Sequence, residues 1–179
     1  MPLLTVQSTK GVITLSKRIA YYGLFAALAI IVGYIEAMFP LPVGIPGVKL
    51  GLANVVVLTA LYVLDVKSAF YISLVRIFIS ALLFKGFGSL IFSASGALLS
   101  FIIMSLIYRF KSVSPIGVSI LGGIAHNIGQ LIAAGIVISN LKIVYYVPVL
   151  LVSGVITGFL TGLVVKYVVP HLKNFSTKI

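Results

Sequence analysis

Six long apolar segments, separated by short polar or turn-forming breaks, dominate this sequence of 179 residues. A helix needs about 20 mostly apolar residues to cross the hydrocarbon core of a bilayer. The second segment is the shortest, with fifteen residues between Lys49 and Asp65, although a terminal lysine can reach toward the interface and lengthen a span. The pattern predicts an all-α integral membrane protein with six transmembrane helices. These cover approximately residues 19–39, 50–64, 68–84, 87–108, 116–138 and 143–168.

The basic residues fall unequally on the two sides of these spans. If the N-terminus is cytoplasmic, nine basic residues lie inside, and only Lys49, Lys85 and Lys142 lie outside. Because cytoplasmic loops carry an excess of lysine and arginine, both termini are predicted to be cytoplasmic. The inside set is Lys10, Lys17, Arg18, Lys67, Arg109, Lys111, Lys166, Lys173 and Lys178.

This topology divides the chain into a cytoplasmic tail (1–18), a membrane domain (19–168) and a second cytoplasmic tail (169–179). The outward loop 40–49 holds three prolines and two glycines, which is typical of a stiff lid. The net charge of +11 follows the loops and forms no basic patch with interleaved aromatics, so no nucleic-acid partner is predicted.

Arg76 is the sharpest polar signal, since it lies nine residues from both Lys67 and Lys85 and is expected near the bilayer midplane. An arginine at that depth must face the protein interior, a cavity or a partner. It could pair with Glu36 or cap a broken helix. Because a guanidinium binds carboxylate or phosphate in a fork, we favour an anchor for an anionic substrate.

Further polar residues occur in apolar surroundings. The stretch "GGIAHNIGQLIAAG" places His126 and Gln130 four residues apart on one helical face, with Asn127 on an adjoining face. These side chains either tie helices together or line a pocket. Asn54 joins Lys49 near the predicted outer surface. His126 makes no metal site, because the other histidine, His171, lies in the predicted cytoplasmic tail and the chain has no cysteine. Neither a metal nor a cofactor is therefore predicted.

Small residues recur at intervals of four in the first span. Gly23 is followed by Ala27, and Ala29 is followed by Gly33 and Ala37. Such spacing is typical of close contact between membrane helices. The contacting helix could belong to this chain or to a partner.

The sequence lacks the motifs of two kinds of catalysis. It has no G-x-x-x-x-G-K-[ST] phosphate loop, which predicts no ATP hydrolysis by this chain. Its only acids are Glu36 and Asp65, which cannot form a magnesium site around a diphosphate. Asp65, beside Lys67, is most simply part of a solvated turn. We therefore expect no enzymatic activity from this chain alone.

Four ordered motifs resemble the Gx transporter family, often labelled heptaprenyl diphosphate synthase component I. They are "LFAALAIIVGYIEAMFP", "PGVKLGLANVVVL", "VRIFISALLFKGFGSLIFSASGALLS" and "AHNIGQL". That family is similar to the substrate-binding S-components of energy-coupling factor (ECF) transporters. The resemblance implies a six-helix bundle with an outward-facing pocket. It also implies a separate module of two ATPases and a scaffold membrane protein, docking at Gly23 and Ala27.

These observations favour a multi-pass subunit of the cell membrane that captures a small anionic micronutrient or precursor for ATP-driven uptake. One alternative is an accessory subunit that binds an isoprenoid head group, either in prenyl diphosphate or quinone metabolism or in a membrane redox system. Another is a structural scaffold without a ligand. The predicted site assigns Arg76 and Lys49 to the anionic group, Asn54, Asn127 and Gln130 to hydrogen bonds, and Glu36 and His126 to a cationic or polar portion.

Overall fold

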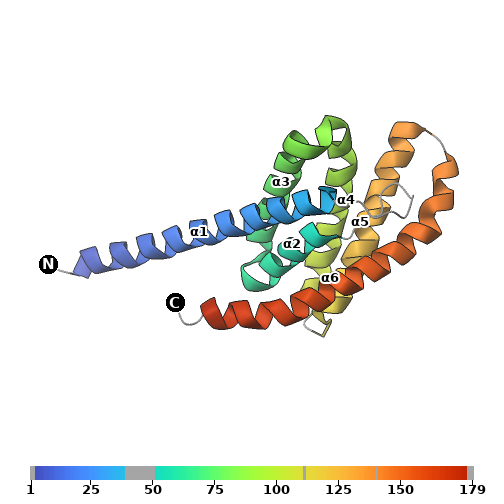
Figure 1. The fold of residues 1–179 in the computed structure, drawn as a ribbon. Coiled ribbons are helices and arrows are strands. Elements are labelled where there is room, and N and C mark those ends of the chain that lie inside the picture. Colours follow the sequence, from blue (N-terminus) through green and yellow to red (C-terminus); the bar gives the residue numbers. More distant parts are fainter. Residues whose placement is uncertain (1–2, 39–50, 111, 140, 177–179) are drawn as a thin grey trace.

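The computed structural model describes residues 3–38, 51–110, 112–139 and 141–176, which form helices and short connections with no β-strand (Figure 1). Two short non-α segments interrupt the order: a π-helical segment, η1, precedes α4, and a 3₁₀ segment, η2, precedes α6. In chain order the elements are α1 (Leu3–Met38), α2 (Leu52–Val63), α3 (Val66–Ser80), η1 (Ala81–Lys85), α4 (Gly86–Tyr108), α5 (Pro115–Ile138), η2 (Leu141–Tyr146) and α6 (Val147–Ser176).

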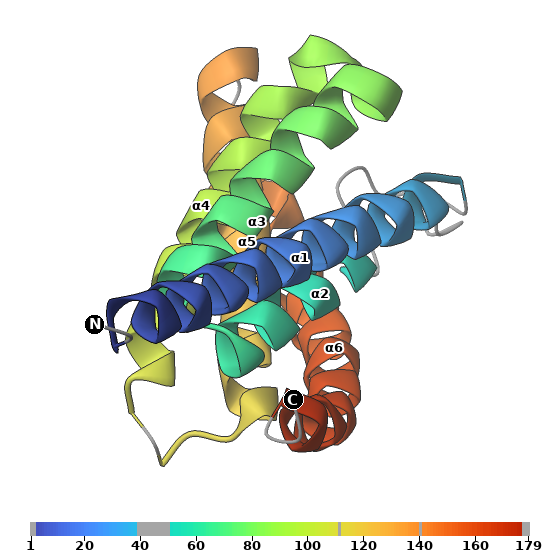
Figure 2. The same ribbon diagram turned by 90° about the vertical axis from the view of Figure 1, so that its left-hand side faces the viewer.

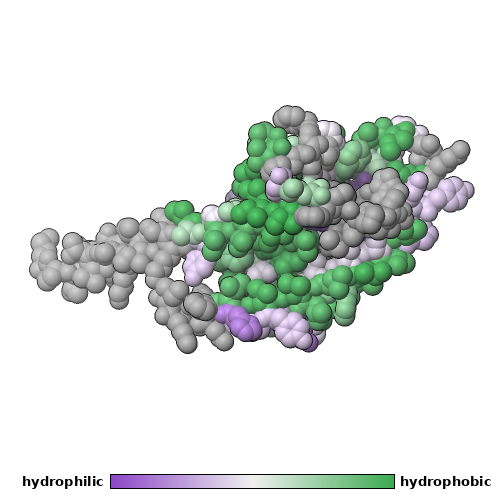
Figure 3. Space-filling model, in the orientation of Figure 1, coloured by the Kyte–Doolittle hydropathy of each residue, from purple (hydrophilic) through white to green (hydrophobic). Residues whose placement is uncertain are grey.

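Five of these helical stretches are long and apolar enough to cross a membrane. Their outer faces carry many exposed leucine, isoleucine, valine and phenylalanine side chains, and Figure 3 shows apolar residues over most of the described surface on one side. Exposed apolar area of this extent is suited to lipid. The chain is therefore a multi-pass membrane protein. The five stretches are Ile19–Met38, Val66–Leu83, Leu90–Tyr108, Pro115–Ile138 and Ile143–Lys173.

The second predicted span differs from the expectation. α2 has only twelve residues, or about 18 Å of helix, and is too short to cross the hydrocarbon core alone. Its start lies at the level of Glu36 of α1, and Ser68, just beyond its end, donates to the hydroxyl of Tyr22 of α1. These two residues of α1 are about 21 Å apart along the helix, so α2 and the turn after it extend over about 21 Å of α1. Because α2 is packed among the other helices, it needs no long lipid-facing surface.

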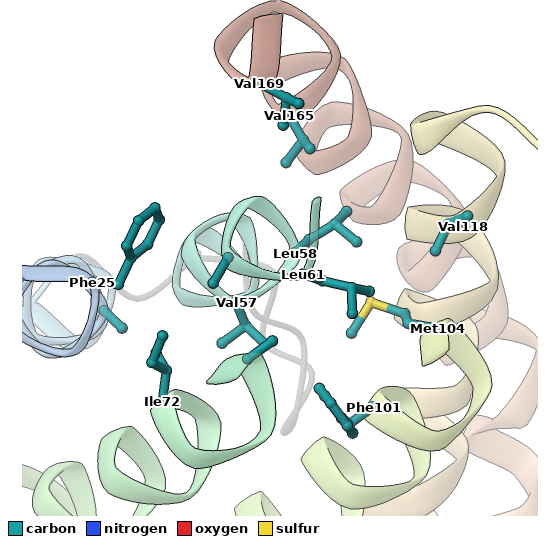
Figure 4. Close-up of a cluster of buried hydrophobic side chains, with 13 residues drawn as sticks. Phe25, Val57, Leu58, Leu61, Ile72, Phe101, Met104, Val118, Val165 and Val169 are labelled. Atoms are coloured by element: carbon teal, nitrogen blue, oxygen red, sulfur yellow. The ribbon is translucent and has the colours of Figure 1, made fainter. Parts of the chain in front are cut away.

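α2 lies at the centre of the main apolar core. Val57, Leu58 and Leu61 are buried between residues of the other five α-helices, among them Phe25 of α1 and Val165 of α6. Figure 4 shows the α2 side chains pointing toward residues of α3 and α4 on one side and of α6 on the other. This core fixes the start of α2, which contributes to the site described below.

The ends of the helices follow from local chemistry. Asp65 caps α3, because its Oδ1 accepts from the Ser68 N–H at 2.9 Å. The sequence suggested that Asp65 belongs to a solvated turn. In the structure its carboxylate also caps α3. Ser114 caps α5 in the same way, with Pro115 in the first helical position.

The two terminal helices extend beyond the predicted spans. α1 is helical from Leu3, and α6 continues past Pro170 to Ser176. Figures 1 and 2 both show the start of α1 and the end of α6 on the same side of the molecule. Most residues of the two predicted cytoplasmic tails are therefore helical.

Glycines bring α5 and α6 into backbone contact. A Cβ added at Gly158 would lie 2.7 Å from the Cα of Ile120, and one at Gly162 would lie 2.6 Å from the Cα of Ile116. On the other helix, a Cβ at Gly123 would lie 2.5 Å from the carbonyl oxygen of Gly154. No larger residue fits at these positions without separating the helices, as is typical of small-residue interfaces in membranes.

Candidate functional site

A polar cavity of about 60 Å³ lies where all six α-helices meet. Six of the seven residues predicted to bind substrate line it, and the seventh, Lys49, lies outside the described residues. We refer to this space as the polar cavity. It is lined by Gly33, Glu36, Gly51, Ala53, Asn54, Arg76, Ile77, Ser80, Ala81, Ser93, Gly123, His126, Asn127, Gln130 and Thr157.

Glu36 of α1 caps the N-terminus of α2. The Gly51 N–H donates to Glu36 Oε1 at 2.6 Å, and the Ala53 N–H donates to Oε2 at 3.4 Å. Gly51 adopts a left-handed conformation with a φ of 72°, which glycine tolerates best. A carboxylate is stabilised at this end of a helix by unpaired N–H groups and by the helix dipole. The partner of the Glu36 carboxylate is thus the backbone at the start of α2.

Arg76 of α3 faces the same cavity, and its environment is different. Its Nε is buried and has no hydrogen-bond partner within the described part of the chain. Glu36 lines the same cavity, and its observed hydrogen bonds go to the backbone of α2. Buried donors are normally satisfied, and leaving one without a partner is costly. Arg76 therefore brings a positive charge and hydrogen-bond donors to the cavity wall, where an anionic group could bind.

His126 and Gln130 form a polar pair on α5. Gln130 Nε2 lies 3.1 Å from His126 Nε2, which places both side chains on the face that the four-residue spacing predicted. Gly96 of α4 makes room for the pair, because a Cβ there would lie 2.7 Å from Gln130 Cγ and 2.8 Å from the His126 carbonyl oxygen. Gly96 was not among the predicted site residues, although a glycine in an apolar span could have marked a close approach.

Asn127, on the adjoining face of α5, ties that helix to α6. Its Nδ2 donates to the Leu150 carbonyl oxygen at 2.7 Å and lies 3.1 Å from Ser153 Oγ. The side chain is only 8% exposed. Both contacts made by this amide nitrogen are with the neighbouring helix, so this residue matches the helix-tying interpretation.

A smaller space of about 20 Å³ continues inward from the polar cavity. The two spaces share Gly51, Asn54, Gly123 and Thr157 in their walls. Ser100, 2% exposed, lines the inner space, and its hydroxyl has no hydrogen-bond partner among the described residues. About 10–15 Å³ is enough for one water. The inner space is therefore large enough for a single water.

Several polar lining residues were not predicted. Ser80 of α3, Ser93 of α4 and Thr157 of α6 all line the polar cavity. Ser80 lies four residues after Arg76, and this spacing on a helix could have revealed it. Thr157 Oγ1 donates to the Ser153 carbonyl oxygen at 2.8 Å, which leaves its lone pairs available to accept hydrogen bonds.

The small residues of α1 fall into two groups. Ala29 and Gly33 are buried, and a Cβ on Gly33 would lie 3.7 Å from Ala53 Cβ and from Ser80 Oγ. Gly23 and Ala27 are exposed, and no described atom lies within 4 Å of a Cβ built on Gly23. The first group packs within this chain, whereas the second is available to lipid or to another protein.

The fold and the site together define a class: a multi-pass α-helical membrane protein with a polar, arginine-containing cavity among its helices. Within that class, the chain belongs to the family described as heptaprenyl diphosphate synthase component I, whose model matches residues 25–168. The matched range includes all described residues of the polar cavity. No curated protein and no solved structure matches the chain.

Proposed function

We propose that this protein is a membrane substrate-binding subunit, similar to an S-component, that captures a small anionic organic molecule for uptake. The observation that carries the proposal is Arg76, which lines the cavity and whose buried Nε lacks a hydrogen-bond partner in the described structure. An anion with two acceptor oxygens would neutralise the guanidinium in the fork geometry that arginine favours.

The other cavity residues divide into ligand contacts and wall supports. Arg76 binds the anionic group, and Asn54, Gln130 and His126 supply hydrogen bonds to the rest of the head group. Glu36 and Asn127 hold the walls, because their observed hydrogen bonds go to α2 and α6. Lys49, predicted at the mouth of the site, would add a second positive charge.

Uptake requires an energy source outside this chain. The proposal assigns ATP hydrolysis to a separate module of two ATPases and a scaffold membrane protein. The exposed small residues Gly23 and Ala27 support a docking position for that scaffold on α1, since small residues allow helices to approach closely. In this proposal the chain is not an enzyme and needs no cofactor.

A second candidate function is favoured by the family description. A "synthase component" works beside another component, so the chain could serve as an accessory membrane subunit in prenyl diphosphate or quinone metabolism, or in a membrane redox system. Its cavity would then bind the anionic head of an isoprenoid. Both candidates place the anion on Arg76, and they differ in whether the molecule crosses the membrane.

Native mass spectrometry of the protein in nanodiscs tests the shared step. We expect an anionic molecule to remain bound to the wild type and to be lost from Arg76→Gln. Arg109→Gln makes the same change at an exposed arginine just after α4 and serves as the matched control. Equal retention by all three proteins would contradict the proposal. Uptake of the identified molecule into proteoliposomes with and without the energising module would separate the two candidates.

A further inference from the structure

The polar cavity is too small to enclose a typical organic ligand. Its volume is about 60 Å³, whereas pockets for drug-sized ligands span roughly 300–1,000 Å³. At about 15 Å³ for each water-sized occupant, the cavity holds only a head group such as a carboxylate or a phosphate. The remainder of the ligand must lie in an adjoining space.

One such space is an apolar groove between α3 and α4, with a volume of about 310 Å³. The hydroxyl of Ser95 donates to the Phe92 carbonyl oxygen at 3.0 Å and so adds no free donor to the groove. The rings of Phe70 and Phe101 meet at its wall, with centroids 5.3 Å apart. We refer to this space as the α3–α4 groove. It is lined by Phe70, Ser73, Leu74, Ile77, Phe78, Leu90, Ala94, Ser95, Ala97, Leu98 and Phe101.

The groove and the polar cavity share one wall residue, Ile77, which follows Arg76 directly. Along α3 the cavity residues extend from Arg76 to Ser80, and the groove residues extend back to Phe70. The two spaces therefore adjoin at Ile77, and a molecule with its head at Arg76 would have to pass this side chain to reach the groove, which follows α3 for about 9 Å back to Phe70. Under the predicted topology, this direction leads from the bilayer midplane toward the cytoplasmic side.

The groove is accessible from the lipid. Leu74, Phe78 and Leu98 at its edge are 44%, 58% and 50% exposed. A hydrocarbon chain could enter sideways from the bilayer without passing through water. A cavity of about 150 Å³ accommodates benzene, so the groove has room for roughly twice that hydrocarbon volume.

We propose that the ligand is a single-chain amphiphile, with its anionic head on Arg76 and its hydrocarbon tail in the α3–α4 groove. This inference rests on the proposed function and narrows its substrate class. The tail can be a linear acyl chain or a branched isoprenoid, because both are apolar and slender. Since lipid is as apolar as the groove, burial alone gives the tail little preference, and selection depends on shape.

The test uses ten-carbon probes and a groove variant. Binding to protein in nanodiscs is measured for inorganic phosphate, decyl phosphate and geranyl phosphate, and for acetate and decanoate, with partitioning into empty nanodiscs subtracted. Leu98→Trp narrows the groove at a lipid-exposed position. Leu106→Trp is the matched control, because Leu106 is on the same helix, is also 50% exposed and does not line the groove.

We expect at least one ten-carbon probe to bind about tenfold more tightly than its short counterpart. Leu98→Trp should weaken that probe about tenfold through overpacking, while the short anion and Leu106→Trp show no change. Unchanged binding of the short anion shows that Leu98→Trp is folded. Leu98→Ala, which widens the groove, should retain binding of the ten-carbon probe. A preference between decyl and geranyl phosphate identifies the chain type.

Two failures can be told apart. If short anions bind in an Arg76-dependent manner and no ten-carbon probe binds more tightly, the amphiphile proposal is wrong and the proposed function stands. The amphiphile proposal is also wrong if Leu98→Trp binds the chains as well as Leu106→Trp does, because the groove would then hold only bulk lipid. If no anion of either length depends on Arg76, both proposals fail.

Discussion

The α5–α6 interface and the α3 side of the polar cavity handle buried polar groups in opposite ways. At α5–α6, Asn127 donates to the neighbouring helix, and glycines bring the two backbones into contact. At α3, Arg76 has a buried donor without a partner in the described structure, next to an apolar groove. The first region pairs its buried amide within this chain, whereas the second leaves a buried donor unsatisfied among the described residues.

The largest expected effect concerns the glycine interface. Gly158→Ala places a methyl group 2.7 Å from the Ile120 Cα and 2.8 Å from the Ser119 carbonyl oxygen. Because both are backbone atoms, we expect the helices to separate at a cost of about 2–3 kcal/mol. Gly23→Ala is the control, since it faces open space, and should be neutral or slightly stabilising. Thermal unfolding in detergent measures both, and equal stability of the two variants would contradict the tight packing of α5 and α6.

The next effect concerns the cap of α2. Glu36→Gln removes the charge that accepts from Gly51 and Ala53, and it should reduce stability by about 1–2 kcal/mol. Asp65→Asn makes the equivalent change at the cap of α3 and should cost a similar amount. The measurement is again thermal unfolding. An unaltered unfolding temperature for Glu36→Gln would show that the carboxylate does not hold α2.

A smaller effect separates two neighbours on α5. Asn127→Ala should reduce stability by roughly 0.6–2 kcal/mol for each interhelical bond lost. Gln130→Ala should instead weaken anion binding, because the hydrogen bond observed for Gln130 is with His126 on its own helix. Titration calorimetry and unfolding of both variants provide the comparison. The division between wall and contact residues is wrong if the two variants exchange these phenotypes.

The hydropathy of the sequence predicted most of the architecture, because long apolar runs with basic ends have few alternatives in a membrane. It overestimated the second span. Residues 50–64 are apolar because α2 is surrounded by protein, and hydropathy cannot distinguish burial in protein from burial in lipid. The same ambiguity affects α1, where Ala29 and Gly33 pack inward and Gly23 and Ala27 face outward, although both pairs have the same four-residue spacing.

The candidate site was predictable in its residues but not in their contacts. Polar side chains in apolar spans share the interior, so Arg76, Gln130 and their neighbours converge on one cavity. The partner of Glu36 could not be read from the sequence, because it is a backbone amide fifteen residues further along the chain. The α3–α4 groove was also beyond reach, since it depends on how two helices cross and not on the pattern of either one.

The most direct test of the central claim is the ligand-free stability of a double-mutant cycle at Arg76 and Glu36. If Arg76 awaits a ligand, removing its charge relieves an unsatisfied buried group. Arg76→Gln should then be as stable as the wild type or more stable, and its effect should add to that of Glu36→Gln within about 0.5 kcal/mol. A loss of about 3–5 kcal/mol in Arg76→Gln, largely restored in the double variant, would show a structural ion pair and contradict the anchor.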